Sequence, residues 1–193
     1  MVNFCDTLRN DFILCNAKNL YNVQRIVFVN KDDLEDYNIV ASNNRNSISF
    51  KLKDGRRGFL FQYNGGEVVS SSFSKTNNRG VSYYRNSISA YIQGVEEKEL
   101  SILKQLDKSN YFGAVLFNSG DVWIYGFEYG LKLSDYTYTT ESDITLESNV
   151  TENYPPLIYI SENPKSDFDD LFENNNDVVR LGDFNNDFNN DFY

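Results

Sequence analysis

Acidic side chains are the most abundant reactive groups in this sequence. The chain carries 28 Asp and Glu residues against 18 Lys and Arg, and it contains no histidine. A pair of carboxylates can hydrolyse a glycosidic bond, so a carboxylate-based hydrolase is one hypothesis. The absence of histidine excludes Ser–His and Cys–His catalytic pairs and any histidine metal ligand. Any acidic chain offers carboxylate pairs, so their presence here does not point to a hydrolase in particular. We therefore expect a protein that is not an enzyme.

Other motifs give no metal or cofactor site. Cys5 and Cys15 are too few for a disulfide framework and match no zinc spacing. The segment GRRGF at residues 55–59 lies between two expected strands and no helix start follows it, so we interpret it as a hairpin turn and not as a phosphate-binding loop. The Asp- and Asn-rich C-terminal segment lacks the spacing and glycine of an EF-hand loop. We therefore expect no cofactor and no metal.

The negative charge is concentrated at the C-terminus. The formal net charge is −10, and residues 161–193 hold nine acidic and two basic side chains. The preceding residues are close to neutral, and no basic block is present, which disfavours tight binding of duplex nucleic acid. The sequence thus predicts a β domain at residues 1–160 and an acidic extension rich in Asn, Asp and Phe at residues 161–193. We expect no membrane span and no signal peptide.

Alternating and β-branched segments predict a mainly β fold with strands throughout residues 21–161. No strand is expected beyond Pro164, where the chain becomes Asn- and Asp-rich. The expected strands cover residues 21–30, 46–53, 59–64, 65–76, 81–94, a strand–turn–strand unit at 111–130, then 131–148 and 155–161.

One segment has the period of a helix. Leu100, Leu103 and Leu106 recur every three residues, which places them on one face. Glutamates come early in the segment and lysines late, an order that complements the helix dipole. The pattern predicts a single flanking α-helix at about residues 95–108.

Aromatic residues in the strands suggest a second function. A row of them could form a platform for sugars, although aromatic residues favour strands generally and pack in sheets and interfaces. The residues concerned are Tyr83, Tyr84, Tyr91, Trp123 and Tyr125.

The order of several motifs resembles a known family. Cys15 is followed by a short polar run and then by VQRIVFVNKDDL. The segment SSSFSKTNNRGVSYYRNSISAYIQG, the expected helix and YFGAVLFNSGDVWIYGFEYGLKLSD come later, in that order. This arrangement, from about Cys15 to Ile160, resembles the tail tube and tail hub proteins of tailed bacteriophages that infect Bacteroides-like hosts, including the crAss-like group. The chain departs from the family pattern where Leu20 and Tyr21 replace a glycine pair. It departs again at DYTYTTESDITLES, where the family has a Thr-Gly stretch.

The resemblance implies a structural virion protein without catalytic activity. The family fold is a β-sandwich or barrel with one flanking helix, and its subunits close into hexameric or stacked-hexamer rings. Such rings form a conduit through which genomic DNA passes without tight binding. The implied location is the virion tail, assembled in the host bacterial cytoplasm next to other tail or portal-adaptor proteins. Alternatives are a head–tail adaptor ring and a carbohydrate- or receptor-binding β-sandwich module of the tail.

The acidic extension carries spaced apolar side chains that could anchor it to a neighbouring subunit or tail protein. A segment of this composition does not fold alone, but it can become ordered when it docks. The docked form could be helical or extended, and the alternative is a solvated tail that only aids solubility. The candidate anchors are Phe168, Leu171, Phe172, Phe184, Phe188, Phe192 and Tyr193.

Overall fold

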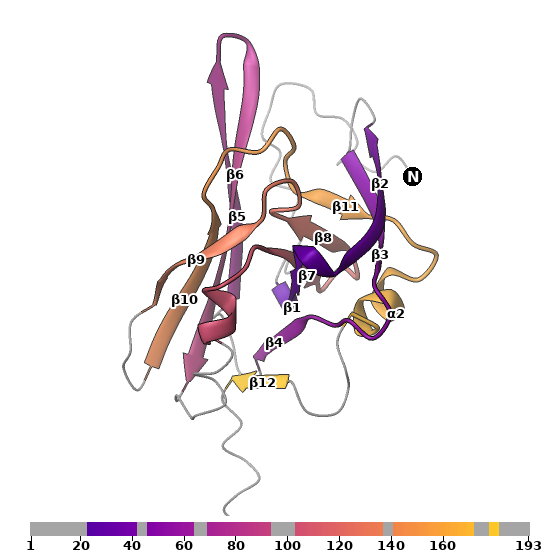
Figure 1. Ribbon diagram of the computed structural model, residues 1–193, viewed down its shortest axis with the longest axis vertical. Coiled ribbons are helices and arrows are strands. Elements are labelled where there is room, and N and C mark those ends of the chain that lie inside the picture. The colour runs from indigo at the N-terminus through magenta and orange to yellow at the C-terminus, as the bar shows by residue number, and fades with distance from the viewer. Residues whose placement is uncertain are drawn as a thin grey trace, which may run out of the picture.

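A computed structural model describes residues 23–41, 46–63, 69–93, 103–136, 141–171 and 178–181, and the fold within them is mainly β (Figure 1). A short 3-10 helix, η2, spans Lys31–Asp33, and the α-helix α2 spans Pro164–Asp169. The strands are β1 (Val23–Asn30), β2 (Leu34–Ala41), β3 (Asn46–Leu52), β4 (Phe59–Tyr63), β5 (Val69–Asn78), β6 (Val81–Gln93), β7 (Tyr111–Phe117), β8 (Val122–Tyr125), β9 (Leu131–Tyr136), β10 (Glu141–Ser148), β11 (Leu157–Tyr159) and β12 (Val178–Leu181).

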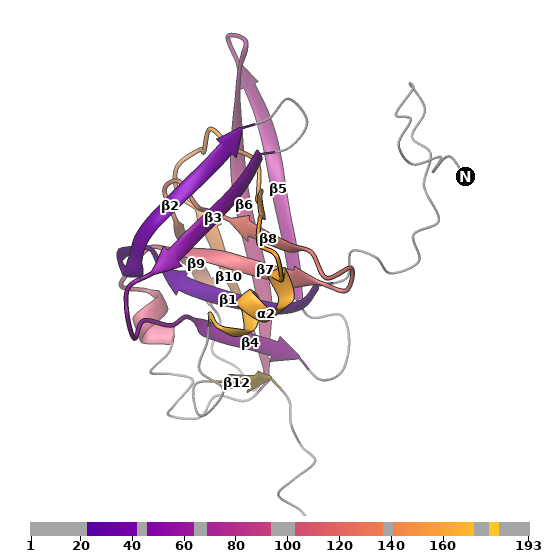
Figure 2. The ribbon, with the colours of Figure 1, turned by 90° about the vertical axis from the view of Figure 1, so that its right-hand side faces the viewer.

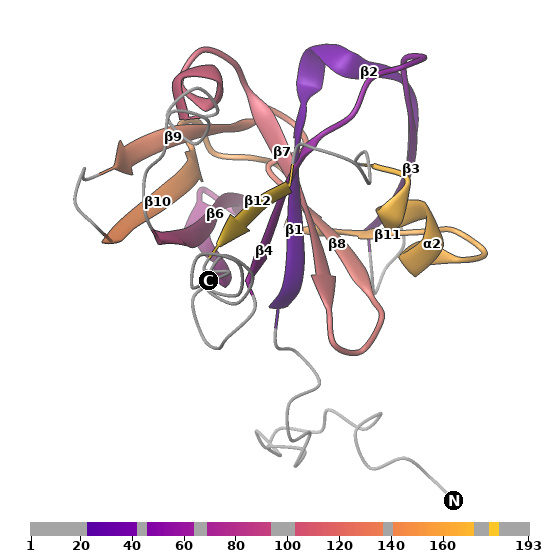
Figure 3. The same cartoon turned by 90° about the horizontal axis from the view of Figure 1, so that it is seen from below.

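The described strands form one branched, mixed sheet. The main path runs β2-β3-β11-β8-β7-β9-β10-β6-β5, and β1 joins β7 to β4, which pairs in turn with β12. Two pairs, β11–β3 and β12–β4, are parallel, and the others are antiparallel. Strand β7 meets β9 at a single pair, Tyr111 with Leu131, so the sheet bends sharply there into two layers. Figure 3 shows β6, β9 and β10 on one side of the central strands and β2, β3 and α2 on the other.

The central strands β1 and β7 are buried on both faces because their sequences are almost continuously apolar. Every residue of β7, YFGAVLF, is buried, as are Ile26 to Val29 of β1. Side chains alternate between the two faces of a strand, so each strand supplies two separate cores. Ile26 and Val115 face one core, and Val27 and Ala114 face the other.

The first core lies between the central strands and the layer formed by β9, β10, β6 and β5. Ile88, Ile144 and Leu146 fill it from that layer. Gly113 allows the close approach, because a Cβ atom at this position would lie 2.2 Å from Ile88 Cδ1. The layer therefore has one apolar face, turned inward, and one outward face.

Part of the predicted helix covers the same core. Residues 103–106 are helical, with Leu103 and Leu106 buried and Lys104 exposed, as the spacing of the leucines predicts. Leu100 and the rest of the predicted segment before residue 103 lie outside the described residues. The mainly β fold with a flanking helix is thus confirmed.

The second core is closed by β2, β3, β11 and α2. Ile48, Leu157 and Phe168 contribute to it from three different elements. Helix α2 begins with a proline at its first turn, a favourable position, and buries Phe168. The core therefore extends past residue 160, where the sequence analysis placed the end of the β domain.

Three features of the fold differ from the sequence-based expectations. Residues 34–41 form β2, which was not predicted, and β12 is a strand beyond Pro164, where none was expected. The GRRG segment is not a hairpin turn, because β3 pairs with β2 and β11 whereas β4 pairs with β1 and β12. None of the helices in the described ranges has the length and apolar character needed to cross a bilayer.

Candidate functional site

The outward face of the β5–β6–β10–β9 layer is lined with hydroxyl groups. Register pairs Ser70 with Ser89 and Ser72 with Ser87, and the period of two places all four on the face opposite Ile88 and Ala90. Ser89 Oγ lies 3.0 Å from Thr145 Oγ1 of β10, which extends the polar face to a third strand. Hydroxyls are neutral groups that exchange hydrogen bonds with water or ligand. Glu147 of β10 lies opposite Ser87 and beside Lys132 of β9 on this face, so its neutral part is the serine-lined surface of β5 and β6.

The hairpin formed by β5 and β6 projects beyond the body of the protein (Figures 1 and 2). We call residues 72–87 the arm. Within the arm the two strands pair from Ser72–Ser87 to Asn78–Val81, and Arg79 and Gly80 form the turn with φ of 50° and 83°. Phe73 and Val81 are about half exposed on it, at 48% and 49%.

Strands β5 and β2 are open edges of the described sheet. Strand β5 pairs only with β6 among the described strands, and β2 only with β3. Tyr37 and Val40 of β2 are exposed apolar side chains. An open edge presents unpaired backbone groups that can accept another strand. The two ends of the main strand path can therefore each extend into another chain.

A buried carboxylate fastens the base of the arm to the body. Glu152 forms two backbone hydrogen bonds with Tyr84 of β6, of 2.7 and 2.8 Å. Its side chain is buried, with the residue 2% exposed, and Oε2 accepts a hydrogen bond of 2.8 Å from Asn86 Nδ2. Asn86 N in turn donates to Ser148 Oγ of β10, at 3.1 Å. Glu152 Oε1 and Asn86 Oδ1 are buried without a hydrogen-bond partner.

Burial raises the pKa of Glu152 to about 7, because desolvation disfavours its charged form. The nearby Glu128 carboxylate raises this pKa further. The backbone of Tyr129, the Lys31 ammonium and Asn86 act in the opposite direction. Glu152 therefore changes its charge near neutral pH at the junction between arm and body. A raised carboxylate pKa also occurs in catalytic acids, so the surroundings of Glu152 decide its role.

The polar groups around Glu152 hold the backbone in place and do not form a catalytic site. Lys31 Nζ donates to the backbone carbonyls of Phe127 (2.7 Å) and Glu128, which fixes the turn between β8 and β9. Glu128 accepts hydrogen bonds from Asn153 N, at 2.6 Å, and from Asn153 Nδ2. The small cavity beside Glu152 is lined otherwise by apolar side chains and Glu128. The described residues include no group of three His, Cys, Asp or Glu side chains that could hold a metal ion.

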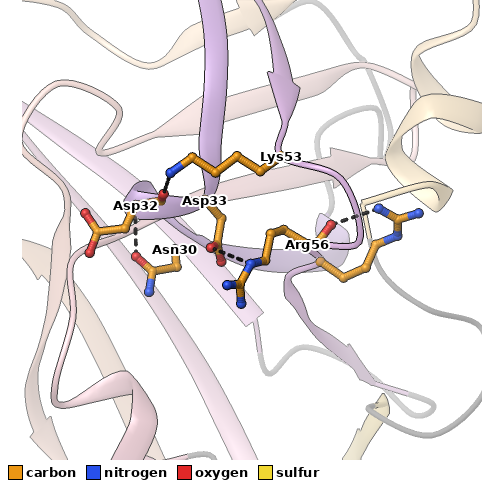
Figure 4. Close-up of polar contacts among 6 residues, drawn as sticks. Asn30, Asp32, Asp33, Lys53 and Arg56 are labelled. Carbon is orange, nitrogen blue, oxygen red and sulfur yellow. Dashed lines mark hydrogen bonds and ion pairs between the residues drawn. The ribbon is translucent and has the colours of Figure 1, made fainter.

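The arginines of the GRRG segment belong to another polar cluster, at the turn between β1 and β2 (Figure 4). Lys53 Nζ donates to the carbonyl of Asp32 at 2.6 Å, and Arg56 Nε lies 3.4 Å from Asp33 Oδ1. Asn30 Oδ1 accepts from Asp32 N and caps η2. These contacts tie the β3–β4 connection to the turn, so Arg56 has an acidic partner within the chain.

Two of the seven candidate anchors lie inside the protein's own core. Phe168 is fully buried, with the Arg25 guanidinium 5.2 Å from its ring centroid, and Leu171 is buried beside it. Arg25 also forms an ion pair of 2.7 Å with Asp169, which holds α2 against β1. In this conformation neither anchor is available to a neighbouring protein. Phe172, Phe184, Phe188, Phe192 and Tyr193 lie outside the described residues.

The aromatic residues considered for sugar binding do not share a surface. Tyr125 is buried, and its hydroxyl accepts a hydrogen bond from Ser71 at 3.1 Å. Trp123 packs on the first core and makes an edge contact with Phe117. Tyr83 and Tyr84 lie at the arm instead, and the side chain of Tyr91 lies outside the described residues. Packing accounts for Trp123 and Tyr125.

Comparison with known proteins adds no relative: no family model, curated protein or solved structure matches this chain.

Proposed function

We propose that this chain is a structural subunit of a bacteriophage tail that assembles into rings, with no catalytic role. The rings form part of the tail tube or hub, or of the head–tail junction, and surround a passage for DNA. The observation that carries the proposal is the pair of open strand edges, β5 and β2, at the two ends of one strand path. The family resemblance of the motifs from Cys15 to Ile160 supports it independently.

The open edges support assembly because an exposed edge of this length is an aggregation hazard unless another strand covers it. Strand β5 has ten residues and no proline, and its one charged side chain, Lys75, lies in the arm on the face of Phe73, outside the base of the strand. Two different edges of one subunit can meet head to tail, and such heterologous contacts close into a ring when the rotation allows it. Pairing of β2 of the next copy with the base of β5, residues 69–71, covers the β2 edge and leaves the edge of β5 within the arm open.

The hydroxyl-lined face supports the role of a conduit wall. Ser70, Ser72, Ser87 and Ser89 present neutral groups, and Arg85 is the only arginine on that face of β5 and β6. Affinity for a phosphate backbone comes mainly from Lys and Arg side chains, and a face poor in them lets DNA slide. Turned toward the axis of a ring, this face would make a polar, non-gripping lining.

The test is imaging of the purified full chain at high concentration, together with its mass in solution. We expect rings or stacked rings with six-fold symmetry. Lysines on the open edge, as Ser70→Lys with Ser72→Lys, should abolish them because charged edge residues oppose strand addition. The control adds the same charge elsewhere, as Ser49→Lys on β3 with Asn118→Lys in the β7–β8 turn, both exposed positions.

Two results would contradict the proposal. One is a chain that remains monomeric at every accessible concentration. The other is its absence from purified phage particles examined by mass spectrometry. Loss of rings in the control variant as well as in the edge variant would show that charge alone, and not the β5 edge, governs assembly.

A further inference from the structure

The arm is positively charged although the chain as a whole is negative. From Val69 to Gln93 there are three basic residues and no acidic one, whereas the chain has a net charge of −10. Lys75, Arg79 and Arg85 are all exposed, and none of them forms an ion pair within the described part of the chain. An exposed projection with three uncompensated cations suits an anionic partner.

The tip of the arm holds its arginine at a conformational cost. Arg79 has a φ of 50°, and it is the sole non-glycine residue with positive φ among those described. A two-residue turn of this kind favours Asn-Gly, because Asn tolerates the left-handed region better than a long side chain does. Asn occupies the two preceding positions, Asn77 and Asn78, but not this one. Strain at an exposed tip points to a role for the guanidinium itself.

The sequence of the same chain contains a segment with the complementary chemistry. Residues 182–193, GDFNNDFNNDFY, carry three aspartates and no base. In an extended conformation successive side chains point to opposite sides. Asp183, Asp187 and Asp191 would then lie on one side of the segment and Phe184, Phe188 and Phe192 on the other. The segment is thus a potential strand with an acidic side and an aromatic side.

We propose that the arm of one copy binds residues 182–193 of another copy, as a strand added to the open edge of β5. The phenylalanines lie on the side of Phe73, which is half exposed, and the aspartates lie on the side of Ser72, Ser74 and Arg85. Arg79 lies at the tip, and Lys75 lies on the side of Phe73, where it adds to the positive field of the arm. Backbone hydrogen bonds supply the pairing, as in other cases of strand addition to a sheet edge, and the charges fix direction and register.

The positions of the two partners favour contact between copies. The tip of the arm and β12, after which residues 182–193 begin, lie at opposite ends of the molecule in Figures 1 and 2. A contact from the end of one copy to the opposite end of the next repeats along an axis and does not close on itself. It therefore links one ring to the next, while the body of the subunit makes the ring. In this sense the inference rests on the proposed function, and it names the segment that joins successive rings.

A duplex DNA partner is less favoured for the arm. Three cations release few counterions, and the net negative charge of the chain repels a phosphate backbone at long range. The acidic segment, by contrast, is present at the same copy number as the arm, and inside an assembly its effective concentration is high.

The experiment uses a synthetic, fluorescently labelled peptide of residues 182–193 and measures its binding by fluorescence anisotropy. The receptor is the full chain carrying Asp183→Asn, Asp187→Asn and Asp191→Asn, so that its own segment competes less. We expect saturable binding that weakens as salt is raised. Adding Lys75→Gln, Arg79→Asn and Arg85→Gln to the receptor should weaken binding by about tenfold or more.

Matched controls separate the arm from general charge. Arg57→Gln, Lys104→Gln and Lys108→Gln remove three exposed cations outside the arm and should leave binding unchanged. A peptide with its three phenylalanines changed to serine, or its three aspartates to asparagine, should bind at least about tenfold more weakly, a result that does not depend on the folding of any protein variant. A labelled DNA duplex is measured in parallel.

Three outcomes would overturn the inference. The first is no peptide binding up to about 1 mM, a concentration at which even weak pairs associate. The second is equal binding of the peptide to the receptor with and without the arm substitutions. The third is DNA binding that requires the arm while the peptide does not bind. The measurement needs no rings. Failure of peptide binding with rings intact would refute only this inference, and peptide binding by a chain that never forms rings would refute only the proposed function.

Discussion

Replacing Glu152 by glutamine should remove a pH dependence of folding that this one carboxylate creates. Glutamine keeps the shape and an oxygen that can accept from Asn86 Nδ2, but it carries no titratable group. The pKa of Glu152 is about 7 in the folded protein against an ordinary value of 4.5. Each pKa unit corresponds to about 1.4 kcal/mol, so the difference amounts to about 3 kcal/mol.

The sign of the effect follows from proton binding. Between pH 4.5 and about 7 the folded state holds a proton on Glu152 that the unfolded state has lost. The free energy of unfolding of the natural chain therefore falls as pH rises through this window, and it levels off above the folded pKa. Relative to the natural chain, Glu152→Gln should gain stability across the window, by about 3 kcal/mol in total.

The assay is urea unfolding of both chains at several pH values from 4.5 to 8.5, followed by tryptophan fluorescence. The difference between the two free energies of unfolding is the quantity of interest, because other titrating groups and the overall repulsion of an acidic chain largely cancel in it. Glu147→Gln, which removes a carboxylate from an exposed position of β10, controls for the loss of one negative charge. A difference that does not change with pH would refute the assignment of a buried, destabilised carboxylate at this position.

Three further substitutions test the packing and the turn, each by the free energy of unfolding in urea. Phe168→Ala should cost about 3–5 kcal/mol, since it empties a fully buried site where α2 meets the second core; a cost near zero would mean that α2 is not docked there. Gly113→Ala should destabilise by about 1–3 kcal/mol because the new Cβ meets Ile88 Cδ1, and Ile88→Val, which removes that atom, should recover part of the loss; no recovery would place the strain elsewhere. Arg79→Asn should stabilise by about 1 kcal/mol, because asparagine accepts a φ of 50° more readily, and a loss of stability would show that the arginine side chain supports the fold.

The sequence predicted the elements whose signal is local. The apolar runs of β1 and β7 and the alternation of β3 and β6 each indicated a strand, and the leucine spacing indicated the helical turn at residues 103–106. These signals depend on side chains within one element. They do not depend on which other element covers it.

The missed elements have little local signal. Strand β2 reads LEDYNIVA, with mostly exposed residues, and becomes a strand because β3 pairs with it. Strand β12 is four residues in an Asn- and Asp-rich segment, and it is recruited by the edge of β4. Phe168 looked like a free anchor in an acidic tail, and it is buried because Arg25 and Asp169 hold α2 on the body.

The buried Glu152 could not be identified from the sequence either. It lies in a polar stretch, SNVTENY, and nothing in its neighbours distinguishes it from the other acidic residues. Its environment is made by Tyr84 and Asn86 of β6, far away along the chain. The arm was predicted as two strands, but its projection from the body depends on where the other layer ends, which only the folded structure defines.

The pairing of β1 with β7 also constrains how the protein is made. Strand β1 leaves the ribosome early, yet one of its two neighbours is complete only when Phe117 has been synthesised. Until then the apolar strand β1 lacks the backbone hydrogen bonds on one of its two edges. Contacts between segments so distant in the sequence form slowly. A nascent chain of this protein therefore carries a half-paired apolar strand, a site for aggregation, through more than half of its synthesis.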